Sequence, residues 1–124
     1  MATPPESLDD DAVLAAITDA MVALHERYYH RPPGSAKSQF MGEDLIACVL
    51  GNVYTDVEKT LIELQRSPSV TENRSAFQIA MQHRFVAAVE SASGRRVAHF
   101  ISSHHVGPDL EIELFFFEDA PRGI

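Results

Sequence analysis

The spacing of apolar residues near the N-terminus predicts a long amphipathic helix. Successive apolar residues lie three or four positions apart and therefore share one helical face. These residues are Val13, Ile17, Met21, Leu24 and Tyr28. Ser7 stands before a run of aspartates and is the expected N-cap. Pro32-Pro33-Gly34 ends the helix, because proline cannot donate the next backbone hydrogen bond.

The next segment reads as a β-hairpin followed by a short helix. Lys37–Met41 forms the first strand, 42–44 the turn, and the apolar run Leu45–Leu50 a second strand that we expect to be buried on both faces. Thr55 and Glu58 have the spacing of a capping box and begin a short helix that Pro68 closes.

A second long helix and a second hairpin complete the predicted order. The helix starts near Ser69 or Thr71 and ends at Gly94, a residue suited to the left-handed C-terminal position. Its apolar residues follow at exact four-residue steps, and they are Phe77, Met81, Phe85 and Val89. The hairpin occupies residues 97–117, with its turn between His105 and Leu110.

The last strand has two different faces. One face is apolar throughout, with Leu110, Ile112, Leu114 and Phe116. The other changes from acidic to aromatic, with Glu111, Glu113, Phe115 and Phe117. We interpret the second face as the outer one, so that Phe115, Phe117 and Phe100 need a further cover, from the N-terminal helix or a second subunit. A homodimer is therefore expected.

These elements predict an α+β fold, a two-layer sandwich of order α-β-β-α-α-β-β in which helices pack on a mainly antiparallel four-stranded sheet. The 124 residues are sufficient for one domain, expected at 9–118 between flexible ends at 1–8 and 119–124. No run of apolar residues is long enough to cross a membrane, so we expect a soluble protein of the cytoplasm without direct membrane insertion.

Charge and cysteine content exclude several classes of function. A net charge of −8 repels phosphate backbones, so nucleic acid is an unsuitable partner. The single cysteine, Cys48, lies within an apolar run and is expected to be a buried thiol rather than a nucleophile.

The clustered side chains at the second hairpin turn suggest a metal site first. His104, His105 and Asp109 stand close together in sequence, and Glu111 and Glu113 follow. Adjacent strand residues point to opposite faces, however, so the two histidines cannot easily bind one ion. Ser102 and Ser103 lack a nucleophile-elbow pattern, and no glycine-rich loop opens a helix. We therefore expect no metal, no cofactor and no enzymatic activity.

Two sets of residues remain as candidates for contact with a partner or a ligand. Tyr29 and Arg31 lie in a rigid turn just past the first helix and could contact a protein. Basic and imidazole side chains could also bind a small anion, together with Asp109 beside them. The candidates are Lys37, Arg95, Arg96, His104 and His105.

Several of these segments together resemble the MpsC-like family, over roughly residues 10–118. They are Tyr29–Pro33, Glu43–Ile46, Leu50-Gly51, Thr55–Lys59, Phe85–Glu90, Gly94–Val97 and Ser103–Asp109. The family's usual Tyr-Gly-Arg-Gly-Pro is here Tyr-His-Arg-Pro-Pro at 29–33, and Ser103 replaces a frequent aspartate. The resemblance implies a component of a sodium-translocating, membrane-potential-generating system and provides no catalytic residue.

The leading hypothesis is an accessory or regulatory protein that works beside an integral membrane partner in ion or inorganic-carbon transport. It would act by protein contacts and lie at the membrane only through that partner. The alternative is a cytoplasmic sensor that binds a small molecule or anion at a homodimer interface.

Overall fold

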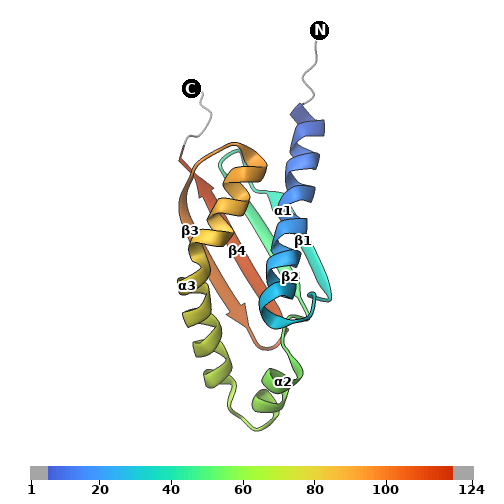
Figure 1. Cartoon of the computed structure of the whole chain (residues 1–124), viewed down its shortest axis with the longest axis vertical. Coiled ribbons are helices and arrows are strands. Elements are labelled where there is room, and N and C mark those ends of the chain that lie inside the picture. Colours follow the sequence, from blue (N-terminus) through green and yellow to red (C-terminus); the bar gives the residue numbers. More distant parts are fainter. Residues whose placement is uncertain (1–5, 119–124) are drawn as a thin grey trace.

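The computed structural model describes residues 6–118, in which helices cover one face of a four-stranded sheet (Figure 1). The elements are α1 (Glu6–Tyr29), β1 (Ser35–Phe40), β2 (Leu45–Gly51), α2 (Asp56–Glu63), α3 (Ser67–Ser93), β3 (Val97–His105) and β4 (Leu110–Phe117). This order confirms the predicted α+β arrangement. Helices α1 and α3 lie side by side across the sheet, and α2 lies beyond its lower edge (Figure 1).

The two predicted hairpins share one antiparallel sheet of order β1-β2-β4-β3. Strands β2 and β4 join the hairpins and form its centre. Glu111 on β4 stands between Leu50 on β2 and His104 on β3, and two residues further along, Glu113 stands between Cys48 and Ser102. This register places both carboxylates on a central strand, near the end of the sheet where β4 begins.

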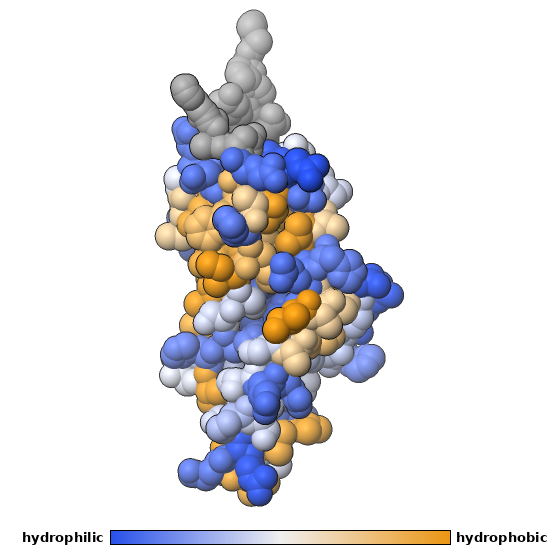
Figure 2. Space-filling view, turned by 90° about the vertical axis from the view of Figure 1, so that its left-hand side faces the viewer, coloured by the Kyte–Doolittle hydropathy of each residue, from blue (hydrophilic) through white to orange (hydrophobic). Residues whose placement is uncertain are grey.

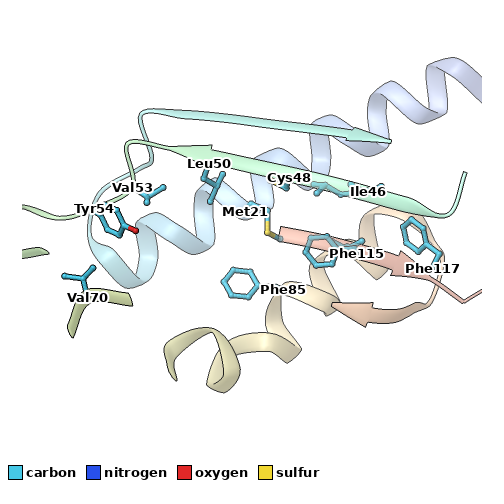
Figure 3. Close-up of a cluster of buried hydrophobic side chains, with 12 residues drawn as sticks. Met21, Ile46, Cys48, Leu50, Val53, Tyr54, Val70, Phe85, Phe115 and Phe117 are labelled. Atoms are coloured by element: carbon cyan, nitrogen blue, oxygen red, sulfur yellow. The ribbon is translucent and has the colours of Figure 1, made fainter. Parts of the chain in front are cut away.

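The apolar core lies between the sheet and the two long helices. Met21 of α1 and Phe85 of α3 meet Ile46, Cys48 and Phe115 of the central strands (Figure 3). Phe100 joins this layer from β3, with its ring centroid 5.0 Å from that of Phe115 and 6.1 Å from that of Phe85. Cys48 is buried as expected, and burial raises the pKa of its thiol to about 11.

The prediction of which β4 face is covered was wrong. Phe115 and Phe117 are buried beneath the helices, on the same face as Glu111 and Glu113. The cover for Phe115 and Phe117 is thus the chain's own layer of helices, and not a second subunit. The apolar face with Ile112 is the uncovered one, because its side chains are only half-buried. Strand β2 likewise is not buried on both faces, since fully buried and half-buried residues alternate along it.

Several helix boundaries also differ from expectation. Helix α1 begins at Glu6, so Ser7 lies within it rather than at the N-cap. Pro68 does not close α2. It lies in the first turn of α3, where backbone N–H groups have no partner within the helix. Proline, which has no N–H, therefore costs no helical hydrogen bond there. The capping box at Thr55 and the left-handed Gly94 are confirmed.

Of the predicted flexible ends, 1–8 and 119–124, residues 1–5 and 119–124 lie outside the described residues, and residues 6–8 belong to α1. Within residues 6–118, no helix has the length and hydropathy needed to span a membrane.

Candidate functional site

A buried arginine lies where α2, α3 and the start of β4 meet. Arg74 of α3 is 1% exposed and donates to both carboxylate oxygens of Glu58, at 2.7 and 2.6 Å. The same guanidinium donates to Glu111 at 3.1 Å and to the backbone carbonyl of Val53 at 2.9 Å. Bonds to Glu58 thus tie α2 to α3, and the bond to Glu111 ties both helices to β4.

Two tyrosine rings enclose this arginine. The guanidinium carbon lies 3.9 Å from the ring centroid of Tyr29 and 4.9 Å from that of Tyr54. Burial raises the pKa of both phenols, that of Tyr54 to about 12, so both stay neutral at physiological pH. Neutral rings provide cation–π faces to a charge that is already paired.

The carboxylate of Glu111 is shared between Arg74 and an imidazole. Nδ1 of His104 lies 3.1 Å from Oε2 of Glu111, and both side chains are buried. Burial alone would raise the pKa of Glu111, but His104 and Arg74 outweigh it and hold that pKa below its usual value. Glu58 behaves in the same way because Arg74 and the Thr55 amide bond it.

Glu113 lies in a different environment from Glu111, although it is only two residues away. Its Oε2 accepts a hydrogen bond from the amide of Gln78 at 3.2 Å, and its Oε1 has no partner within residues 6–118. Burial and the neighbouring Glu111 charge raise the pKa of Glu113 to about 8. The two carboxyls therefore hold opposite protonation states at neutral pH.

A pocket of about 240 Å³ opens between α3 and β3, beside this cluster. It is lined by Ser75, Gln78, Ile79, Gln82, Phe100, Ser102 and His104. Figure 2 shows the side of the molecule formed by α3 and β3, where hydrophobic residues gather in the upper half below a hydrophilic rim, and hydrophilic residues cover most of the lower half.

The uncovered side of the sheet is a second candidate surface. Its register brings apolar side chains together in neighbouring rows, with Ala47, Leu114 and Ile101 in one and Val49 and Ile112 in the next. We call this surface the open face. Its strand residues are Ser35, Lys37, Gln39, Leu45, Ala47, Val49, Gly51, His99, Ile101, Ser103, His105, Leu110, Ile112, Leu114 and Phe116. A depression of about 280 Å³ lies at its β1 edge, beside Met41.

The structure separates the aromatic residues that the sequence grouped as an interaction surface. Phe115 and Phe117 belong to the core, and Phe100 packs against it. Tyr29 covers Arg74, and Arg31 donates from Nη1 to the carbonyl of Tyr54. None of these five residues lies in the open face.

The proposed anion ligands are scattered too. Lys37 and His105 are exposed on the open face, whereas His104 points to the opposite side, as the alternation of strand residues predicts. Arg95 donates to the Glu43 carbonyl at 2.8 Å, and the exposed Arg96 lies 3.8 Å from Glu118.

Asp109 has a structural role at the turn, because it accepts the Val53 amide at 2.8 Å. Residues 6–118 contain no group of three or more His, Cys, Asp or Glu side chains placed to hold a metal ion.

Sequence reasoning missed the two polar residues that organise the buried cluster. Arg74 and Gln78 follow Val70 at four-residue steps and lie on the helix face that also buries Phe85 and Val89. That spacing was the available signal. An arginine and a glutamine in line with core positions imply buried polar partners, which Glu111 and Glu113 supply.

The family model described as "Na+-translocating membrane potential-generating system (MpsC)" matches residues 10–119. Searches of curated proteins and of solved structures gave no match.

Proposed function

Because the chain belongs to the MpsC family, we propose that it is a non-enzymatic accessory component of a Na⁺-translocating, membrane-potential-generating system. In this proposal it acts by contact with a membrane-embedded subunit of that system and lies at the membrane through this contact. The open face is the contact surface. The contact surface predicted from the sequence, with Phe115 and Phe117, is not available, because the fold buries both rings.

The observation that supports this proposal is the composition of the open face. Its central residues, including Val49, Ile112 and Leu114, are apolar and only half-buried, and Ile101 is 50% exposed. An antiparallel sheet with helices on one side ordinarily has a polar outer face. A contiguous apolar surface of this kind is typical of protein interaction sites.

The charge pattern indicates the character of the partner surface. The open face contains Lys37, His99 and His105 and no acidic residue, although the chain carries a net charge of −8. A neutral or acidic partner can therefore approach this side without the repulsion that the rest of the molecule would exert. The predicted homodimer stays a prediction, with a second copy as the competing occupant of the same face.

The alternative function, an anion sensor, has less support. Lys37, Arg95, Arg96 and the paired histidines lie on different parts of the structure, and Arg31 is engaged by a backbone carbonyl. A single chain thus provides no convergent basic site from these residues.

The proposal is tested by complementation in cells that lack this chain. Na⁺-dependent membrane potential is measured with a voltage-sensitive dye after return of wild type, of Ile112→Glu on the open face, or of Ala76→Glu on the exposed side of α3. We expect wild type and Ala76→Glu to restore the potential and Ile112→Glu to fail while remaining folded. Full restoration by Ile112→Glu, or an undiminished potential in the deletion strain, would contradict the proposal.

A further inference from the structure

Strand β3 forms an edge of the sheet that no other described strand covers. The order β1-β2-β4-β3 leaves it paired on one side only, with β4 (Figure 1). In an antiparallel ladder every second residue directs its N–H and C=O away from the paired strand. Only the ends of β3 have additional partners for these groups, since Val97 donates to Glu90 and His105 accepts from Tyr54. Between the two ends, the outer backbone groups have no partner within residues 6–118.

The opposite edge of the sheet is protected against pairing, and β3 is not. Strand β1 has six residues with Lys37 near its middle. A short edge strand and an edge lysine are two ways in which proteins prevent association between sheets. Strand β3 has nine residues and contains no Lys, Arg, Asp, Glu or Pro. Its one irregularity lies at its start, between Val97 and His99, so a regular strand of residues 99–105 remains available for pairing.

The surface on both sides of this edge is partly apolar. On the helix side, the pocket of about 240 Å³ between α3 and β3 has no Lys, Arg, Asp or Glu in its lining. Ile79, which lines it from α3, is 76% exposed. On the other side of the sheet, Ile101 at the midpoint of β3 is 50% exposed. A strand added at this edge would bury apolar surface on both sides as well as satisfy the backbone.

Charge favours a second copy of this chain as the source of that strand. Two copies that each carry a net charge of −8 repel one another, so they associate most easily through surfaces that lack carboxylates. Strand β3 and the lining of the adjacent pocket meet this condition. The open face differs, because its Lys37 and its lack of acidic residues suit a partner of opposite charge.

The sequence of β3 is compatible with pairing to itself. Two identical strands can pair in antiparallel orientation about a two-fold axis, which makes the contact self-complementary. With the axis at Ile101, the two Ile101 side chains stand opposite each other. His99 of one copy then faces Ser103 of the other, and Phe100 faces Ser102. No pair of like-charged lysines, arginines or carboxylates results from this register.

We propose that β3 pairs in antiparallel orientation with β3 of a second copy of this chain, so that two four-stranded sheets join into one sheet of eight strands. The two α3 helices lie on the same side of the joined sheet, where Ile79 of each copy is covered by the other. The open face stays free for a different partner. This dimer therefore does not depend on the proposed function.

Sedimentation velocity over a protein concentration series tests the proposal. We expect wild type to be a dimer. Ile101→Lys places like charges opposite each other, and Ile79→Lys removes the apolar contact between the copies, so each should raise the dimer Kd roughly tenfold. Val57→Lys is the matched control, since Val57 on α2 is 71% exposed and lies outside the interface. Its Kd should equal that of wild type. A monomeric wild type, or an unchanged Kd in both Ile101→Lys and Ile79→Lys, would overturn the proposal.

A further variant and a second measurement locate the interface. Ile112→Glu, at the centre of the open face, should keep the wild-type Kd, whereas a dimer formed through that face would dissociate. In amide hydrogen exchange, alternate residues of 99–105 should exchange roughly tenfold more slowly in wild type than in Ile79→Lys, with β1 unchanged. Loss of the dimer in Ile112→Glu, or equal exchange along β3 in wild type and Ile79→Lys, would show that the copies meet elsewhere.

Discussion

Three carboxyl groups around one buried arginine determine the chemistry of the interior. Glu58 and Glu111 pair with Arg74 directly and stay ionised, whereas Glu113 accepts a hydrogen bond from the Gln78 amide, has no such ion pair and is protonated at neutral pH. The difference between their pKa values arises from neighbouring charges and hydrogen bonds and not from depth, because Glu111 and Glu113 are both at most 2% exposed. Glu58 and Glu111 therefore make stability depend on Arg74, whereas Glu113 makes it depend on pH.

Removal of the central guanidinium should be strongly destabilising. Arg74→Met leaves Glu58 and Glu111 buried without their counter-charge, and loss of one partner of a buried ion pair costs about 3–5 kcal/mol. Urea denaturation measures the loss. Arg84→Met, at an exposed position on the same helix, should stay within about 0.5 kcal/mol of wild type. A loss below about 1 kcal/mol for Arg74→Met would show that the cluster does not hold the helices to the sheet.

The pH dependence of stability should depend on Glu113. The pKa of this carboxyl is raised from 4.5 to about 8 in the folded state, so the folded chain favours its protonated form. Its contribution to the free energy of unfolding is complete below pH 4.5 and is lost as pH rises through about 8.

Denaturation of Glu113→Gln at pH 6 and pH 9 tests this directly. The neutral amide cannot ionise, so the variant should lose less stability between the two values than wild type. Glu72→Gln, exposed on α3, should keep the wild-type pH dependence. Parallel curves for wild type and Glu113→Gln would refute the raised pKa.

At the scale of elements, local signals predicted the order of helices and strands. Apolar spacing, the Thr55 capping box and Gly94 act within one or two turns of chain, and their outcomes agree with the structure. The covered face of β4 could not be obtained in this way. Alternation defines two faces, and the usual association of carboxylates with solvent fails here because Arg74 and Gln78 arrive from a helix over thirty residues away.

The end of α1 contains a strained residue where the MpsC-like motif usually has glycine. His30 adopts φ 62°, and its amide bonds to the carbonyl of Glu26 at 2.8 Å, which is a left-handed helix end. This conformation costs a residue with a Cβ roughly 1–2 kcal/mol.

Replacement of His30 by glycine should therefore stabilise the protein. The side chain is exposed, so His30→Gly loses little packing and should raise the free energy of unfolding by about 1 kcal/mol. His83→Gly, within helix α3, should instead lower it by about 0.5 kcal/mol. Thermal or urea unfolding distinguishes the two. A destabilised His30→Gly would mean that the imidazole makes a contribution larger than the backbone strain.

At the scale of the whole molecule, the two sides of the sheet have separate roles. One side is closed by α1 and α3 over a core that contains the Arg74 cluster and the α3–β3 pocket. The open face carries its apolar residues without any covering element from residues 6–118 (Figure 1). The sequence suggested an uncovered apolar surface but assigned it to Phe115 and Phe117, because which side receives the helices is a property of the assembled fold.

The central claim is that the open face binds a membrane-embedded subunit of the same Na⁺-translocating system. The most direct measurement is the amount of that subunit recovered with the tagged chain in mild detergent, after co-expression with wild type, Ile112→Glu or Ala76→Glu. We predict recovery with wild type and Ala76→Glu, and a loss of about tenfold with Ile112→Glu, because a carboxylate would be buried without a partner. Equal recovery with all three, or none with wild type, would contradict the claim.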